Sequence, residues 1–374
     1  MAYSIGGENR DYRFAFESVP AKIPGSGTNI PLHYDLSEAP AGFWTHVKAD
    51  GGDMIITRSD GATRQALEIV FINTGTSNGE IHFKASSLSS VIPEKFYLYY
   101  GNAGASQPAR DAAFGIEEVW SSGEYHNVFH FQSKTGDTDS TSYQNDWLSG
   151  SGCTLASGKL PGQAMSHNGS TDYGTFPSGS FGSNSDLITV EMWHKSAETL
   201  NDAMIFGGRD FASNQRRFDA RVNYSPSVAG SIQSEYYDND TPDEEAVSGY
   251  VNSDVGMQDD VWQHVVITFD NPNDTIEFYI DGVNQTTVYG LQETPANFAD
   301  FTFNFFTGAW NNVGVAGLFN ACTLDEFRLS TILRDQTYIT TAFNNQDDPS
   351  AFWTTGAEEA AGLSMIECGY ILLD

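Results

Sequence analysis

Short apolar stretches that alternate with polar residues recur along most of this chain, and turn-forming residues separate them. Residues 186–194, 262–270 and 323–330 show the two-residue period of a strand with one buried face. The 36 Gly and 13 Pro residues lie among Ser, Thr, Asn and Asp, a composition that is typical of frequent turns. The pattern predicts an all-β protein and excludes a helical bundle.

Two stretches predict hairpins. Asp60-Gly61 interrupts the apolar run 53–72, and Asp281-Gly282 interrupts the run 275–289. An Asp-Gly step supplies the positive φ angles that a tight hairpin turn needs. One short helix is predicted over 335–344, where Tyr338, Ile339, Ala342 and Phe343 fall on one face.

The charge balance restricts the partners. The chain has 49 acidic and 18 basic residues, a net charge of −31. Such a surface repels phosphate backbones and anionic membranes, so we expect no nucleic acid as a partner. No stretch of about 18 apolar residues is present, so we expect no membrane insertion.

The small, polar stretch 101–109 indicates the end of a first domain. We therefore predict an N-terminal β-rich domain over 1–120, a second β domain over 121–350, and a C-terminal tail over 351–374. The apolar end of the tail, Met365–Leu373, is a candidate assembly strand that either caps its own sheet or docks on another subunit.

The N-terminal residues contain no basic start followed by an apolar core, so no secretory signal is predicted. The three cysteines, Cys153, Cys322 and Cys368, are far apart and form no CxxC motif. They suit buried thiols in a reducing cytoplasm, although pairing of Cys153 with Cys322 stays open.

The second domain resembles the laminin-G-like, concanavalin-A-like jelly roll from about residue 126 to 346. Six motifs occur in the order of that family, namely Val128–Phe131 with its following turn, Gly162–Tyr173, Ile188–Trp193, Trp262–His264, Tyr279–Val283 and Leu324–Ser330. The resemblance implies a jelly roll that binds carbohydrate.

The first domain is similar to a small β-rich domain of unknown function that precedes laminin-G-like domains in phage structural and bacterial surface proteins. Pro31–Leu36, Asp50–Asp53 and Tyr97–Asn102 carry this similarity. It implies a β-sandwich-like architecture and indicates no chemistry.

Motifs for catalysis are missing from the sequence. Glycan-cleaving enzymes of this fold carry spaced carboxylates on one strand, whereas Asp325 and Glu326 are adjacent and Glu191 stands alone. We therefore expect no enzyme activity. His126 and His130 lie on an expected strand with no ligand cluster beside them, which predicts a packing or hydrogen-bonding role.

Some relatives of this fold hold a structural calcium ion between the opening turn and the last strand. By that resemblance Asp137, Asp139 and Asp325 are candidate Ca²⁺ ligands. The acidic loop 238–245 fails the EF-hand pattern, since Asp243 stands where glycine is needed.

Sugar binding requires aromatic faces beside polar groups. Two stretches offer this combination at the rim of the sandwich, Tyr236-Tyr237 and Trp310-Asn311-Asn312. Burial of these aromatic rings in the core is the alternative.

The resemblance and the lack of a signal together favour a virion surface protein, assembled in the host cytoplasm and bound to other virion proteins. We expect a tail-fibre-like receptor-binding or capsid-decoration role, a host-surface glycan as ligand and a homo-oligomer, with a trimer as the first expectation. The alternatives are a secreted, extracellular bacterial adhesin module that binds sugar and a polysaccharide-cleaving enzyme on the same fold.

Overall fold

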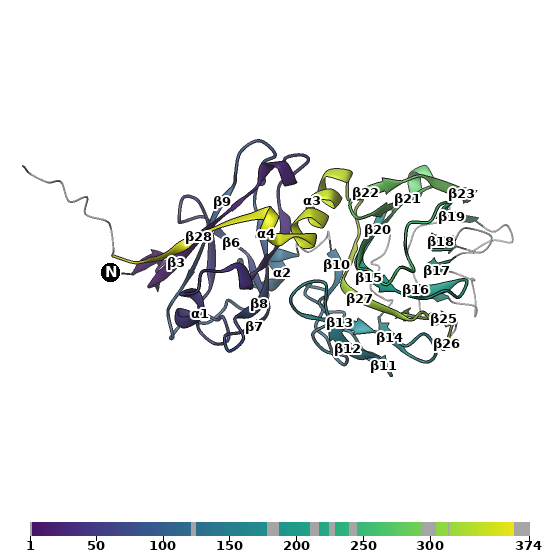
Figure 1. Ribbon diagram of the computed structural model, residues 1–374, viewed down its shortest axis with the longest axis horizontal. Coiled ribbons are helices and arrows are strands. Elements are labelled where there is room, and N and C mark those ends of the chain that lie inside the picture. Colours follow the sequence, from purple (N-terminus) through teal and green to yellow (C-terminus); the bar gives the residue numbers. More distant parts are fainter. Residues whose placement is uncertain are drawn as a thin grey trace, which may run out of the picture.

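The computed structural model describes residues 2–120, 125–177, 187–209, 217–223, 229–238, 245–292, 304–312 and 314–362. Figure 1 shows two β domains side by side, with helix α3 (Gln336–Asp347) between them. The all-β prediction is confirmed. Among the described residues, no helix is both long and apolar enough to cross a bilayer.

The N-terminal domain consists of two facing sheets. The five-stranded sheet has, in order, β28 (Trp353–Ala360), β3 (Tyr12–Ser18), β9 (Lys95–Tyr100), β5 (Ile55–Arg58) and β6 (Arg64–Gln65). The three-stranded sheet has β4 (Ile30–Asp35), β8 (Asn78–Ala85) and β7 (Leu67–Asn73). Aromatic rings fill the space between them, and the Phe16 ring lies 4.7 Å from Tyr34 and 5.6 Å from Phe83.

Short elements complete this domain. They are β1 (Tyr3–Ile5), β2 (Glu8–Arg10), α1 (Phe43–His46), α2 (Ile116–Val119) and two 3-10 turns at Pro20–Lys22 and Leu36–Glu38.

The second domain is a sandwich of two mainly antiparallel sheets. The eight-stranded sheet contains β12 (Thr154–Ser157), β13 (Gln163–Ser166), β27 (Cys322–Ser330), β15 (Leu187–Ser196), β20 (Gln263–Asp270), β21 (Thr275–Ile280) and β22 (Val283–Gln285) in this order, with β10 (Tyr125–Phe129) also paired to β27. A 3-10 turn, Asn271–Asn273, joins β20 to β21.

The ten-stranded sheet covers the other side of the core. Its order is β11 (Ser149–Ser151), β14 (Tyr173–Phe176), β24 (Phe305–Thr307), β16 (Ala203–Arg209), β17 (Arg217–Val222), β18 (Ile232–Asp238), β19 (Glu245–Val251) and β23 (Thr287–Gln292), with β25 (Trp310–Asn312) and β26 (Val315–Gly317) beside β16.

Alternation along the strands determines which side chains enter this core. On β17, Phe218, Ala220 and Val222 are buried in the core, so Arg217 and Asp219 project from the opposite face of the sheet. We call that opposite face the outer face of the ten-stranded sheet.

Both hairpin predictions are confirmed. Strands β5 and β6 pair across a turn in which Gly61 has φ 68°, and β21 pairs with β22 across Asp281 (φ 51°) and Gly282 (φ 75°). The predicted helix is also present as α3, which begins after Asp335, whose carboxylate accepts a hydrogen bond from the Tyr338 N–H. Cys153 and Cys322 are buried and free, so they do not pair.

The segment that we assigned to a C-terminal tail returns to the first domain. After α3 and the short α4 (Pro349–Phe352), β28 pairs antiparallel with β3 as the edge strand of the five-stranded sheet. The domain range 351–374 therefore has to be corrected over Trp353–Ala360, because these residues hydrogen-bond to the N-terminal domain. Residues 363–374, including the candidate assembly strand and Cys368, lie outside the described residues.

His194 provides a prediction about pH. Its ring is fully buried, neither ring nitrogen has a hydrogen-bond partner among the described residues, and burial lowers its pKa to about 3. Histidine in the unfolded chain has a pKa of about 6.5. As the pH falls below this pKa, the unfolded chain binds a proton at His194 and the folded chain does not. The folded state therefore loses stability.

We therefore expect the His194→Leu variant to gain stability relative to the wild type as the pH falls from about 6.5 towards 4, by up to about 1.4 kcal/mol per pH unit. Urea unfolding of both proteins across this range measures the difference. Parallel stability curves would contradict the assignment.

Candidate functional site

The three predicted calcium ligands do not form one group. Asp139 accepts hydrogen bonds from the backbone N–H groups of Val128, Thr141 and Asn145, and Asp325 accepts from those of Lys159 and Leu160. Asp137 accepts from the Ser133 N–H. These carboxylates fix loops by hydrogen bonds, and among the described residues the three do not form a group of His, Cys, Asp or Glu ligands. Calcium binding at these residues stays a prediction.

The predicted sugar-binding residues are largely buried. Tyr236 is fully buried in the core of the second domain, which removes it as a stacking platform. Trp310 is 7% exposed, and Asn311 donates to the Asn304 carbonyl and accepts from the Gly314 N–H. The side chains of Tyr237 and Asn312 lie outside the described residues.

A network of two arginines and two carboxylates lies on the outer face of the ten-stranded sheet. Asp219 on β17 and Glu235 on β18 are directly opposite in the strand register. Arg217 forms ion pairs with both carboxylates, and Arg221 does the same from the other side, with its Nη2 2.5 Å from a Glu235 oxygen. The Arg217 guanidinium also lies 4.4 Å from the centre of the Trp310 ring.

Burial shifts the protonation of this network. Burial raises the pKa of Asp219 to about 7, despite the opposing effect of Arg217, and it also raises the pKa of Glu235. The outer face thus brings an aromatic ring, guanidinium donors and carboxylate acceptors together, with Arg217, at 18%, the most exposed side chain of the four charged groups. Such groups suit a polyhydroxylated ligand.

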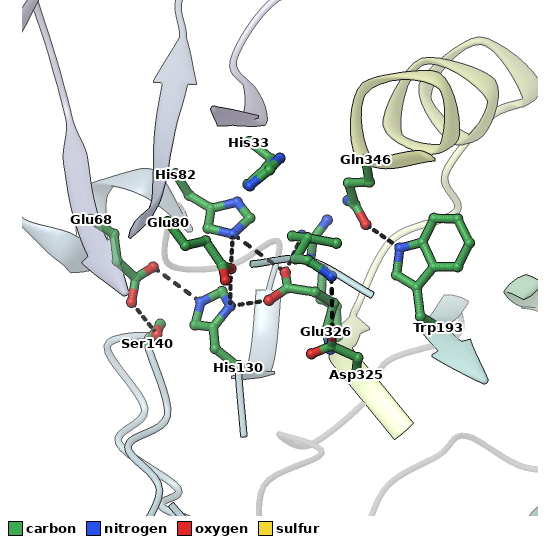
Figure 2. Close-up of polar contacts among 12 residues, drawn as sticks. His33, Glu68, Glu80, His82, His130, Ser140, Trp193, Asp325, Glu326 and Gln346 are labelled. Carbon is green, nitrogen blue, oxygen red and sulfur yellow. Dashed lines mark hydrogen bonds and ion pairs between the residues drawn. The ribbon is translucent and has the colours of Figure 1, made fainter. Parts of the chain in front are cut away.

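A second cluster lies at the interface between the two domains, and Figure 2 shows its members converging. Glu80 and His82 project from β8 of the first domain, His130 follows β10, and Glu326 lies on β27. The potential ligand atoms of these four side chains all lie within 4.8 Å of one another, and all four residues are buried. We call these four residues the interdomain cluster.

Contacts within the interdomain cluster are short. His82 Nε2 lies 3.1 Å from Glu80 Oε1 and 3.5 Å from Glu326 Oε2. His130 Nδ1 contacts Glu326 Oε1 directly and lies 4.0 Å from Glu80 Oε1. The two carboxylates from different domains therefore share the same pair of imidazoles.

Without an ion, the interdomain cluster requires unusual protonation states. Burial and the nearby Glu326 charge raise the pKa of Glu80 well above its usual value, and burial lowers the pKa of His82. Burial alone would lower the pKa of His130, but the negative charges of Glu326 and Glu68 have the larger effect and raise that pKa. These directions favour the protonated form of Glu80, the neutral form of His82 and the charged form of His130.

Further polar groups surround the interdomain cluster. Glu68 Oε2 lies 3.3 Å from His130 Nε2, and Glu68 also accepts hydrogen bonds from Trp120 and from the Ser140 hydroxyl. On the other side, the buried Arg328 donates to Glu326 at 2.6 Å and to Glu191 at 3.1 Å. The interface is therefore a continuous buried polar network.

Helix α3 adds direct links between the domains. Gln346 accepts a hydrogen bond of 2.6 Å from Trp193 Nε1 in the second domain, and Asn345 forms hydrogen bonds of 2.7 and 2.9 Å with the backbone of His33 in the first. The two domains are thus connected both through side chains and through β28.

The sequence analysis missed the interdomain cluster. It predicted a packing or hydrogen-bonding role for His130, and this imidazole does contact Glu68 and Glu326, but the analysis expected no ligand cluster beside it. The available signal was the Glu80-Ile81-His82 spacing, which puts both polar side chains on one face of a strand. The outer-face network carried a similar signal, because Arg217, Asp219 and Arg221 alternate with apolar residues.

A groove in the N-terminal domain is a further concave feature. It has a volume of about 770 Å³ and is open to solvent, and Glu8, Arg64, Asn102, Gln107 and Phe114 are among its lining residues.

Comparison with known proteins agrees with the fold of the second domain. Residues 168–340 match the Concanavalin A-like lectin/glucanases superfamily, a match that lies entirely within this domain. No curated protein sequence matches the chain significantly. The family match thus agrees with the resemblance to concanavalin A-like, laminin-G-like jelly rolls that the sequence motifs indicated for this domain.

Several solved structures are similar to the chain. Domain 4 of AbnA, a GH43 extracellular arabinanase from Geobacillus stearothermophilus in complex with arabinotriose, is 17% identical with a TM-score of 0.43, and the match covers 59% of this chain and 98% of that one. The binding domain of Paraclostridial Mosquitocidal Protein 1 is 11% identical with a TM-score of 0.43, over 59% and 52% of the two chains. A structure of botulinum neurotoxin type C, whose cell entry depends on two ganglioside molecules, is 10% identical with a TM-score of 0.42, over 60% and 51%. The chain spans about half the length of these two toxin structures.

Proposed function

We propose that this protein is a non-catalytic binding protein that holds a glycan on the outer face of the ten-stranded sheet. The observation that carries the proposal is the contact of Arg217 with Trp310 on one side and with Asp219 and Glu235 on the other. An aromatic ring and fixed charged groups are the two features that orient a sugar ring and its hydroxyls.

The ion pairs favour binding over cleavage. A glycosidase needs one carboxylic acid that can protonate the leaving group and one carboxylate that can reach the sugar or a water molecule. Here the carboxylates of Asp219 and Glu235 both form ion pairs with the same two arginines. Asp219 is also fully buried. Arg217, whose side chain is 18% exposed, is the member of the network that a ligand can reach.

A glycan array followed by titration with the strongest ligand tests this proposal. We expect the wild type to bind, and we expect Trp310→Ala to weaken binding by about tenfold or more, because the Trp310 ring supports the Arg217 guanidinium that the ligand contacts. Tyr143→Ala removes an aromatic ring that is 45% exposed and stacks on His126 of the eight-stranded sheet, so this control should bind as the wild type does.

Thermal melting of each variant checks that it is folded. Unchanged binding by folded Trp310→Ala, or a wild type that binds no glycan on the array, would contradict the proposal.

Polysaccharide cleavage is the second candidate, and the opposed Asp219 and Glu235 with their raised pKa values favour it. Detection of new reducing ends after incubation with the glycans that bind distinguishes the two functions. We expect none. Release of reducing ends that is lost in Asp219→Asn would establish the enzyme instead.

We place the protein on a virion surface by analogy, since the order of its two domains resembles that of phage structural proteins. Its partners would then be other virion proteins and a host-surface glycan, and the assembly a homo-oligomer. Mass spectrometry of purified particles would detect the protein among tail or capsid components. Its presence only among secreted bacterial proteins would favour the adhesin alternative.

A further inference from the structure

The interdomain cluster combines features that a salt-bridge network alone does not require. Its two imidazoles and two carboxylates come from both domains and aim their ligand atoms at one point. We propose that Glu80, His82, His130 and Glu326 bind one divalent transition-metal ion, with Zn²⁺ the best match, and that this ion links the two domains.

The separations between ligand atoms suit a four-coordinate ion. Bond lengths of about 2.0–2.1 Å in a tetrahedral zinc site put neighbouring ligand atoms about 3.3 Å apart. His82 Nε2 lies 3.1 Å from Glu80 Oε1 and 3.5 Å from Glu326 Oε2, and His130 Nδ1 lies 4.0 Å from Glu80 Oε1. The direct contact between His130 and Glu326 has to open for an ion to enter.

The donor set distinguishes between metals. Calcium prefers six to eight oxygen ligands, whereas two imidazole nitrogens with carboxylate oxygens are typical of zinc and its neighbours in the first transition row. The interdomain cluster therefore predicts a metal of a different class from the Ca²⁺ that the resemblance implied.

Surrounding groups hold two of the four ligands, His130 and Glu326, as a metal site needs them. A ligating imidazole usually donates its second N–H to a carboxylate or carbonyl, which fixes its orientation. His130 can bind through Nδ1 while Nε2 faces Glu68 at 3.3 Å, and Glu68 is itself held by Trp120 and Ser140. Arg328 donates to Glu326 Oε2 at 2.6 Å and so fixes the orientation of that carboxylate.

Burial defines the role of the ion. The four residues are between 0% and 4% exposed, and each domain supplies two of them. A closed set of four protein ligands is typical of structural rather than catalytic zinc. The ion would therefore stabilise the contact between the domains and would act independently of the glycan-binding face.

Metal analysis of the full chain tests this inference. We expect protein that has been stripped with a chelator, incubated with Zn²⁺ and desalted to retain about one zinc per chain and to melt about 5 °C or more above the stripped form. Cobalt provides a second readout on the unmodified chain, since tetrahedral Co²⁺ absorbs strongly in the visible range and hexahydrated Co²⁺ does so only weakly.

Matched variants locate the ion. Glu80→Gln and His82→Gln should reduce the retained zinc at least tenfold. His33→Gln is the control, because His33 is equally buried beside His82, with ring centres 5.5 Å apart, but is not one of the four ligands. It should retain the metal.

Two outcomes would overturn the inference, and neither depends on how a variant folds. One is a wild type that retains no metal and shows superposable melting curves with Zn²⁺ and with chelator. The other is a Co²⁺ spectrum identical to that of the free ion. Either result would identify the interdomain cluster as a proton-linked salt-bridge network.

Discussion

The Arg328→Met variant is expected to lose about 3–5 kcal/mol of unfolding free energy, because removal of one partner from a buried ion pair leaves the other charge uncompensated. Arg328 is 1% exposed and donates to both Glu191 and Glu326. Its guanidinium also lies 4.9 Å from the centre of the Trp120 ring. Methionine preserves much of the volume but neutralises neither carboxylate.

Urea unfolding of the purified protein measures this loss. Lys95→Met is the matched control, because the Lys95–Glu17 pair is exposed, at 38% and 35% of the two side chains, and exposed pairs contribute about 0–1 kcal/mol. A loss for Arg328→Met no larger than that of the control would contradict the interpretation of the interface as a tightly paired network.

Replacement of Trp353 with alanine is expected to cost a similar amount, about 3–5 kcal/mol, through the cavity that it leaves. Trp353 is the first residue of β28, and its ring packs 5.1 Å from Phe16 and 5.9 Å from Phe83. Its indole N–H donates to the His33 carbonyl at 2.9 Å. The Trp353 side chain therefore packs β28 against both sheets of the first domain.

Thr354→Ala is the control on the same strand, because truncation of this side chain leaves no cavity in the core. Thr354 is exposed, so its removal should change stability by less than about 0.5 kcal/mol. If Trp353→Ala unfolds at the same urea concentration as Thr354→Ala, then β28 does not stabilise the first domain as its packing indicates.

Local signals explain which parts of the fold could be predicted. The alternation on residues 186–194 and 323–330 and the two Asp-Gly turns depend on neighbours in the sequence, so they appear without knowledge of tertiary contacts. The burial of Tyr236 could also have been predicted, because it shares a strand face with Ile232.

Long-range contacts explain what was missed. Glu326 lies 196 residues from His130, and the antiparallel pairing of β10 with β27 brings them together, while the packing of the first domain adds Glu80 and His82. Trp353 is the one buried residue of strand β28. The other residues of the strand are exposed or half-buried, so in the sequence they resemble a solvent-exposed tail. Neither feature leaves a pattern within a short window of sequence.

A crystal structure of the full chain with the strongest glycan ligand tests the proposed function most directly. We predict that the sugar lies on the outer face of the ten-stranded sheet, in contact with Arg217 and beside Trp310. A sugar bound instead in the groove of the N-terminal domain, against Arg64, Asn102 and Phe114, would contradict the assignment of glycan binding to the jelly roll.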